Sequence, residues 1–317
     1  MLPGCVRGSV AAVVRGWQHG GVPELPEVEA LAQFLRGRTA GRVVARIEVA
    51  AISALKTFRP APTALRGGTV TDARRHGKWL DLTVDSPADG PLHLVWHLSR
   101  AGWVRWYDAL PQRPARPGKS PIALRVGFDD GSGFDLTEAG TRKRLAVHVV
   151  PDPADVPQVA SLGVEPLSDA FTPERLGELL GARNQQVKGL LRDQGTIAGI
   201  GNAYSDEILL VARTSPFAPT RSYDEPRTRA LHAAIRTVLT EAVATAAGRP
   251  AAELKDAKRR GMRVHGRTGM ACPGWDGTPC GDTVHEVSFA DSSLQYCPTC
   301  QTGGKPLADR RMSRLLR

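Results

Sequence analysis

The sequence has no long apolar segment. Nowhere do about 18 uncharged apolar residues follow one another, the minimum for a helix that crosses a bilayer. It also lacks the composition of a helical bundle or coiled coil, because 33 Gly and 24 Pro among 317 residues predict many turns and short elements. With 41% hydrophobic and 23% charged residues, the composition is otherwise that of a globular protein.

Acidic residues are in deficit. There are 32 Asp and Glu against 42 Lys and Arg, which gives a formal net charge of +10. An excess of this size favours a polyanionic partner, most often nucleic acid. A basic surface that merely serves solubility is the alternative, and charge alone does not decide between them.

Cysteine is scarce and unevenly placed. Cys5 stands alone, whereas Cys272, Cys280, Cys297 and Cys300 follow a C-x7-C-x16-C-x2-C pattern near the C-terminus. Two thiolate pairs separated by the length of a β-hairpin predict a ribbon that holds one structural Zn²⁺. Cys272 is the least secure ligand, because its spacing to Cys280 exceeds the usual two- to four-residue gap. Four unligated cysteines or a reactive thiol pair are the alternatives.

Local patterns divide the chain into five parts. Residues 1–22 differ in composition from the rest of the chain and are interpreted as a disordered leader or the product of a wrongly assigned start, not as a signal peptide. We expect a β-sandwich domain over 23–150, a proline-rich linker over 151–171, a helical domain over 172–262, and a zinc-finger domain with a basic tail over 263–317. The fold class predicted is α+β.

The expected elements follow from periodicity. Apolar residues at three- and four-residue spacing predict a helix over 24–37, and short apolar segments separated by Gly, Pro and Asp predict antiparallel strands over 42–150. Helices are expected in 172–182, 184–194, 202–215 and 225–248, the first capped by Thr172 and the last ended by Gly248. Residues 283–289 and 293–297 are expected to form the strands of the ribbon.

Two further motifs allow more than one interpretation. The turn Gly199–Asn202 precedes a helix, so its backbone N–H groups could bind a phosphate, although most such glycines only form a tight turn. The segment PELPEVEA (23–30) carries two prolines and three glutamates. On physical grounds alone it is a proline-started helix with an acidic first turn.

Taken together, these motifs resemble the family of formamidopyrimidine-DNA glycosylases and endonuclease VIII. PELPEVE, the lysine in RRHGKWL, HLSRAG, AGIGNAYSDEIL and the four-cysteine ribbon occur in that order between residues 23 and about 302. The resemblance implies a β-sandwich, a helix–two-turn–helix domain and a zinc finger, with double-stranded DNA that carries damaged bases or abasic sites in the cleft between them. It implies a DNA glycosylase with abasic-site lyase activity, and we expect a cytoplasmic, nucleoid-associated monomer.

The resemblance also implies roles for individual residues. Pro23 would attack C1′ through a free terminal amine, Glu24 would protonate the sugar ring oxygen, and Lys78 would stabilise charge near the lesion. The residues expected to contact DNA are Asn202, Lys188, Arg100, Arg142, Lys143 and Arg144. Glu27 would support the site structurally.

The chain departs from the family in places that bear on these expectations. Pro23 stands inside a peptide bond, so its nitrogen is nucleophilic only if the working chain begins there, as it would if Val22 is encoded by a GTG start codon. Arg100 replaces a methionine, the Arg-Phe wedge is absent, and Ser292 stands where the zinc hairpin usually carries an arginine. Arg260, Arg263 or the tail residues Arg310, Arg311 and Arg314 could compensate for that arginine.

The stretch 254–266 is short. In the family members specific for oxidised guanine, this stretch carries a loop that covers the base. The resemblance therefore implies oxidised pyrimidines or abasic sites as substrates in preference to 8-oxoguanine. A protein that binds damaged DNA without catalysis is the alternative, and an RNA- or ribosome-binding zinc ribbon ranks last.

Overall fold

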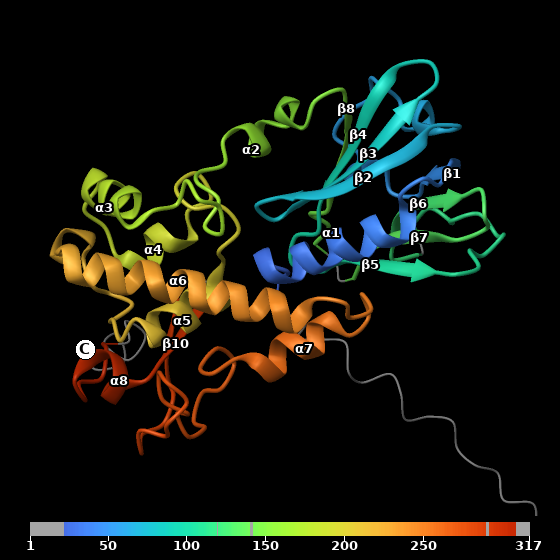
Figure 1. Ribbon diagram of the computed structural model, residues 1–317. Coiled ribbons are helices and arrows are strands. Elements are labelled where there is room, and N and C mark those ends of the chain that lie inside the picture. The colour runs from blue at the N-terminus through green and yellow to red at the C-terminus, as the bar shows by residue number, and fades with distance from the viewer. Residues whose placement is uncertain (1–21, 119, 140–141, 290–291, 309–317) are drawn as a thin grey trace, which may run out of the picture.

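The computed structural model describes residues 22–118, 120–139, 142–289 and 292–308. Two antiparallel sheets lie on one side of the molecule and a group of helices on the other, with the N-terminal helix α1 (Leu25–Thr39) between them (Figure 1). A small cysteine-bearing hairpin follows the helices. The α+β class and its three structural parts are confirmed.

The first part is a sandwich of two four-stranded sheets. One sheet has the order β1-β6-β7-β5, the other β2-β3-β4-β8, and all pairings between neighbouring strands are antiparallel. The strands are β1 (Val44–Val49), β2 (Thr69–His76), β3 (Trp79–Ser86), β4 (Gly90–His97), β5 (Gly102–Tyr107), β6 (Ile122–Phe128), β7 (Gly133–Glu138) and β8 (Ala146–Val150).

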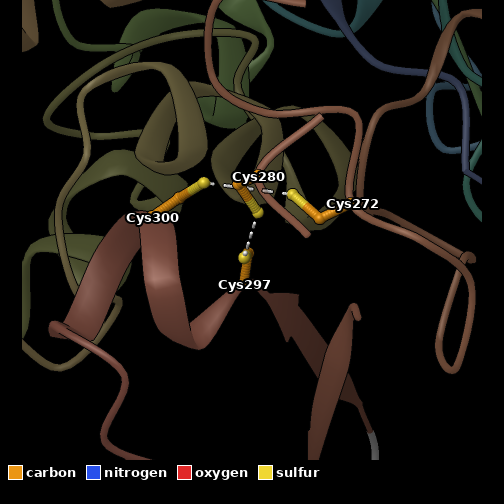
Figure 2. Close-up of side chains that lie close together, drawn as sticks. All are labelled: Cys272, Cys280, Cys297 and Cys300. Atoms are coloured by element: carbon orange, nitrogen blue, oxygen red, sulfur yellow. Dashed lines mark hydrogen bonds between the residues drawn. The ribbon is translucent and has the colours of Figure 1, made fainter. Parts of the chain in front are cut away.

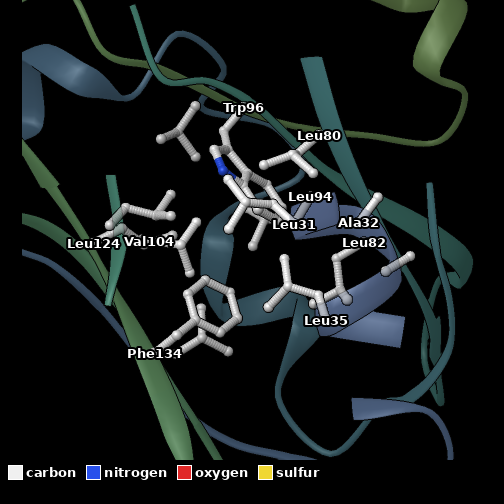
Figure 3. Close-up of a cluster of buried hydrophobic side chains, with 14 of the residues drawn as sticks. Leu31, Ala32, Leu35, Leu80, Leu82, Leu94, Trp96, Val104, Leu124 and Phe134 are labelled. Atoms are coloured by element: carbon white, nitrogen blue, oxygen red, sulfur yellow. The ribbon is translucent and has the colours of Figure 1, made fainter. Parts of the chain in front are cut away.

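The sandwich core forms where the apolar faces of the strands meet α1. Leu31 and Leu35 of α1 pack among side chains from both sheets, including Trp96 of β4 and Phe134 of β7 (Figure 3). These side chains are buried. Burial of apolar area at about 25 cal/mol per Å² is the main force that holds the helix against the strands.

Helix α1 joins the two larger parts of the protein. Its first residue, Leu25, belongs to the core of the helical part, whereas Val28 and Leu31 belong to the sandwich core. Two ion pairs brace the same joint: the buried guanidinium of Arg75 on β2 binds Glu29 of α1 at 2.8 Å and Glu165 at 2.7 Å.

The helical part is built from short helices around the long helix α6. Thr172 caps α3 by accepting the N–H of Arg175, and Gly248 adopts a positive φ just beyond the end of α6, both as expected. The helices are α2 (Pro157–Ala160), α3 (Pro173–Ala182), α4 (Val187–Arg192), α5 (Asn202–Val211), α6 (Glu225–Ala246) and α7 (Leu254–Gly261).

The C-terminal part is a hairpin of β9 (His285–Ser288) and β10 (Ser293–Tyr296), followed by α8 (Pro298–Thr302). The two expected strands of the ribbon are therefore present. Short 3-10 turns complete the chain at η1 (Ile52–Ala54), η2 (Pro62–Leu65), η3 (Pro153–Asp155) and η4 (Thr220–Ser222). Among the described residues, no helix combines the length and apolar character that a membrane span needs.

Strands β2 and β7 and helix α7 are not marked by a continuous apolar run or a helical period in the sequence. Strands β2 and β7 have no continuous apolar run, because β2 buries only Val70 and Ala73 and β7 carries the buried Asp135, which pairs with Arg125. Helix α7 forms in the basic stretch after residue 253. Its apolar face is only Leu254 and Ala257, too short a pattern for the periodicity to predict.

Candidate active site

The carboxylate of Glu24 lies at the N-terminus of helix α5. It accepts the backbone N–H groups of Gly201 at 2.6 Å, Ala203 at 2.9 Å and Tyr204 at 3.3 Å. A Cβ at Gly201 would lie 2.4 Å from the Glu24 carboxyl carbon, so any other residue there would displace the carboxylate from these donors. The free N–H groups of a helix N-terminus favour an anion, and here the anion is a side chain of the same protein.

This arrangement corrects one interpretation of the Gly199–Asn202 turn. The N–H groups that could bind a phosphate are occupied by Glu24, so the turn is not a phosphate site through these donors. The turn is also tied to α1 by the N–H of Leu25, which donates to the carbonyl of Gly199 at 3.0 Å. The motif therefore positions a glutamate.

Glu27 supports the same site from one turn into α1. It accepts the N–H of Glu24 at 2.9 Å and the hydroxyl of Tyr204 at 2.6 Å. Its Oε2 atom also lies 2.9 Å from the Nζ atom of Lys258 on α7. The structural role expected of Glu27 agrees with these contacts.

Lys258 is buried at the centre of this cluster. Its side chain is 9% exposed, and Nζ lies 3.7 Å from Glu24 Oε1 and 2.9 Å from the carbonyl oxygen of Val22. The ammonium group also stands 4.9 Å from the ring centroid of Tyr204. Sequence reasoning assigned no role to this residue. The available signal was that Lys258 lies four residues after Leu254, on the buried face of α7.

Pro23 and Lys78 complete the cluster. Pro23 is buried directly before Glu24. Lys78 stands in the tight turn between β2 and β3, and its Nζ donates to the carbonyl oxygen of Ile200 at 2.9 Å. The structure thus brings Pro23, Glu24 and Lys78 together from segments more than 50 residues apart.

The charges in the cluster shift one another's pKa values. Burial by itself raises the pKa of Glu24, but Lys258, Lys78 and the backbone N–H donors outweigh burial, and the pKa is lowered. Burial lowers the pKa of Lys78, although Glu24 opposes it, and the nearby charges of Lys258 and Arg192 lower it further. Glu24 is therefore a carboxylate at neutral pH in this state.

Lys188 lies in the interior. Its side chain is 6% exposed, and Nζ is held by Asp206 Oδ1 at 2.6 Å, Ser205 Oγ at 2.7 Å and the Asn202 carbonyl at 3.2 Å. Asp206 also bonds His265 Nδ1 at 2.8 Å. All three ammonium donors have partners, and this placement argues against the phosphate contact expected for Lys188.

Asn202 begins α5 and reaches the hairpin. Its Nδ2 atom donates to the carbonyl of Ser293 on β10 at 2.8 Å. Its Oδ1 atom is buried and has no hydrogen-bond partner among the described residues. The amide therefore links the site to the cysteine-bearing part and keeps one acceptor unused.

The other basic residues expected to contact DNA lie on neighbouring loops at one end of the sandwich. Arg100 is exposed in the turn between β4 and β5, and Arg142, Lys143 and Arg144 are exposed between β7 and β8. The two loops are adjacent, because the N–H of Ala139 donates to the carbonyl of Ala101 at 3.2 Å. Lys143 Nζ donates to the carbonyl of Glu138.

His97 orders the first of these loops. Burial, helped by the charge of Lys78, lowers the pKa of His97 to about 4, so the ring is neutral near pH 7. Its Nδ1 atom accepts the N–H of Ser99 at 3.1 Å, directly before Arg100.

The four cysteines converge on one point, as Figure 2 shows. Their sulfur atoms all lie within 4.8 Å of one another, with Cys272 and Cys300 4.0 Å apart and Cys280 and Cys297 3.5 Å apart. Four ligands at the usual Zn–S length of about 2.3 Å would stand about 3.8 Å from each other. The donor set therefore fits a tetrahedral zinc ion, and the long Cys272–Cys280 spacing does not turn Cys272 away.

Several expectations fall outside the described residues. These concern the segment before residue 22 with Cys5, and the tail residues Arg310, Arg311 and Arg314. Ser292, in the place of the usual hairpin arginine, is described and half-buried.

Comparison with known proteins identifies related chains. Residues 22–147 match the model of the formamidopyrimidine-DNA glycosylase N-terminal domain, and residues 162–252 match that of the H2TH domain of the same enzymes. A formamidopyrimidine-DNA glycosylase of Symbiobacterium thermophilum is 33% identical over 304 residues, covering 92% of this chain and 93% of the relative. An uncharacterised glycosylase-like protein of Mycobacterium tuberculosis is 54% identical over 164 residues, which cover 52% of this chain and 99% of that protein.

Solved structures show the same relationship. The Lactococcus lactis Fpg in complex with DNA that contains an abasic site has a TM-score of 0.74 and 25% identity, covering 88% of this chain and 99% of that one. The MutM (Fpg) protein of Thermus thermophilus has a TM-score of 0.72 and 29% identity, covering 90% and 100%. The fold and the site thus define a bifunctional DNA glycosylase and abasic-site lyase. Within that class, the chain belongs to the formamidopyrimidine-DNA glycosylase family.

Proposed function

We propose that the protein excises oxidised bases and cleaves the DNA backbone through a covalent intermediate on Pro23. The observation that carries this proposal is the cluster in which Pro23, Glu24 and Lys78 meet at the N-terminus of α5. The amine would attack C1′ of the damaged nucleoside as the base departs with the electron pair of the glycosidic bond.

Glu24 has a role in this scheme that matches its geometry. As a carboxylate it takes the proton that the secondary amine loses on bonding to C1′. It then donates that proton to the sugar ring oxygen as the C1′–O bond breaks. The resulting iminium makes the C2′–H bond acidic. Loss of the C2′ proton expels the 3′ phosphate, and a second elimination then expels the 5′ phosphate. Lys78 stabilises the negative charge of the phosphate or the opened sugar.

The nucleophile must be an amine with an available lone pair. An amide nitrogen supplies none, so activity requires a chain that begins at Pro23. The family match begins at residue 22, which supports this boundary.

DNA contact is proposed for the exposed cations of the two adjacent loops and for Asn202. Arg100 would fill the gap that the flipped base leaves, and Arg142, Lys143 and Arg144 would contact phosphates. The free Oδ1 atom of Asn202 indicates that this amide has bonding capacity left for a ligand or water. The cysteine cluster would hold one Zn²⁺, which would fix the hairpin that Asn202 touches.

Oxidised pyrimidines and bare abasic sites are the proposed substrates, in preference to 8-oxoguanine. The support is that the stretch after residue 253 forms helix α7, whose Lys258 packs inward against Glu27. It provides no long loop to cover a flipped purine.

Borohydride trapping on DNA with an abasic site tests the chemistry, because borohydride reduces the iminium to a stable cross-link. We expect a chain that begins at Pro23 to be trapped and a chain that keeps residues 1–22 to bind without being trapped. Equal trapping of both forms would mean that another amine is the nucleophile. Binding without trapping by both forms would favour the non-catalytic alternative.

The variant Glu24→Gln tests whether Glu24 matters more for base excision than for lyase action. Acid–base assistance is worth about 10²–10⁴ in rate, so excision of an oxidised base should fall by that factor while a ready-made abasic site is cleaved with a smaller loss. Rates on 8-oxoguanine opposite cytosine, oxidised pyrimidines and abasic DNA then test the substrate preference. A faster rate on 8-oxoguanine would refute it.

A further inference from the structure

Lys258 is a buried cation that neither the proposed reaction steps nor the DNA contacts use. It comes from α7, yet its Nζ reaches the segment directly before α1 and lies 2.9 Å from the Val22 carbonyl oxygen. Standard peptide bond lengths place the Pro23 nitrogen within about 2.6 Å of that oxygen, so the two nitrogens are at most about 5.5 Å apart. In a chain that begins at Pro23, the carbonyl is absent and the ammonium group faces the terminal amine.

We propose that Lys258 is a positioning residue whose ammonium group keeps the Pro23 amine unprotonated and oriented toward the sugar, an inference that rests on the nucleophilic role proposed above. Two positive charges within about 5.5 Å in a dry site repel each other, so a fixed ammonium favours the neutral form of the amine. Only the neutral amine has the lone pair that attack requires.

For this role Lys258 itself must stay charged, and its surroundings ensure that it does. Burial alone would lower the pKa of Lys258, but the carboxylates of Glu24 and Glu27 raise it above the ordinary value. The short contact with Glu27 Oε2 also fixes where the ammonium stands.

Other charged groups also act on the Pro23 amine, and together they determine in which direction its pKa changes when Lys258 is removed. Glu24 and Glu27 on the α1 side favour the protonated amine, whereas Lys78 from the β2–β3 turn and the more distant Arg192 favour the neutral one. Tyr204 on α5 is a neutral phenol at neutral pH, because burial and the nearby glutamates raise its pKa well above the usual range. Removing Lys258 leaves the two carboxylates less opposed, so the amine should hold its proton more strongly.

The experiment measures the rate of borohydride trapping against pH for a chain that begins at Pro23. Lys258→Gln removes the charge but can still donate a hydrogen bond to Glu27. We expect the pH at which the trapping rate is half-maximal, its midpoint, to move up by about one pH unit or more in this variant. Trapping would then be about tenfold slower below the midpoint and unchanged at high pH. Lys258→Arg keeps the charge and should keep the midpoint.

Lys255→Met is the matched control. Lys255 lies on the same helix, but its Nζ stands 4.5 Å from the Trp103 ring centroid and, among the described residues, forms no ion pair with Glu24 or Glu27. Its removal should leave the midpoint unchanged. Binding of each variant to DNA with a non-cleavable abasic analogue shows that the site is still folded.

Glu27→Gln provides an independent arm with the opposite sign. Without that anion the pH midpoint of trapping should move down, which tests the electrostatic premise. Lys258→Met replaces Lys258→Gln if the latter does not fold. A uniform loss of trapping at every pH in Lys258→Gln with an unmoved midpoint would overturn the inference and leave only a packing role. Absence of trapping in the unmodified chain at any pH would instead refute the nucleophilic role of Pro23.

Discussion

Replacing Lys188 by methionine removes the cation that pairs with the buried carboxylate of Asp206. The pair is 6% and 0% exposed on its two sides, and the N–O distance is 2.6 Å. Burial lowers the pKa of Lys188, and Asp206 opposes that effect. Breaking one side of a buried ion pair costs about 3–5 kcal/mol, because the remaining charge stays in the interior without its cation. Within the described part of the chain, Asp206 would keep only its bond to His265.

We therefore expect Lys188→Met to lower the free energy of unfolding by about 3–5 kcal/mol. Adding Asp206→Asn removes the stranded charge and should recover part of the loss. Arg192→Met is the matched control: the residue lies on the same helix but is exposed, and its loss should cost about 0.5 kcal/mol or less. Urea unfolding of the zinc-loaded protein gives the free energy of unfolding of all three variants, which can be compared if their m-values are equal.

The same variants decide whether Lys188 contacts DNA. Each phosphate contact adds about 0.9 to the slope of log K against log salt for duplex DNA. We expect the Lys188→Met slope to equal that of the unmodified protein. Unchanged stability together with a slope reduced by about one would refute the structural interpretation and restore the phosphate contact.

Three further predictions concern other parts of the molecule. Cys300→Ser, or chelation of the metal, should abolish stoichiometric zinc and unfold the hairpin, because structural zinc supplies about 10–16 kcal/mol in small finger peptides; retention of one zinc per chain by metal analysis would contradict this. The pKa of Asp81 is lowered because hydrogen bonds from His76 at 3.1 Å and His93 at 2.9 Å outweigh burial, so its stabilisation is complete above the unfolded pKa of about 3.9 and is lost as pH falls below it. The advantage of the unmodified protein over Asp81→Asn in urea unfolding should therefore shrink as the pH falls from about 4 toward 2, and an advantage independent of pH would exclude this cause. Arg142→Ala and Arg144→Ala should each reduce the salt slope by about 0.9 equally on all DNA sequences, and a loss confined to one sequence would point to base contacts instead.

Local patterns were enough to predict elements whose side chains repeat. The helix expected over 24–37 is α1 (Leu25–Thr39), because Val28, Leu31 and Leu35 recur on one buried face. The strands of the ribbon and the clustering of the four cysteines also followed from spacing alone. In each case the information lies within a few residues of the element that it predicts.

The roles that could not be predicted depend on partners far away in the chain. Glu24 meets Ala203, 179 residues later, so no local feature shows that the Gly199–Asn202 turn receives a carboxylate. Lys188 resembles any lysine beside a glycine until Asp206 is placed against it. Lys258 lies in a run of basic residues that the sequence presents as a solvated surface.

The candidate site is a joint between two hydrophobic cores. Leu25, the residue after Glu24, packs in the helical core, and a Cβ on Gly199 would lie 2.8 Å from the Leu25 Cβ. Three residues later, Val28 packs in the sandwich core. The backbone at Glu24 is therefore held from both sides, and a one-ångström shift of either core would move the carboxylate relative to its N–H donors. Because the proposed nucleophile is the residue directly before this point, the same packing that joins the two parts would hold its amine in place for attack.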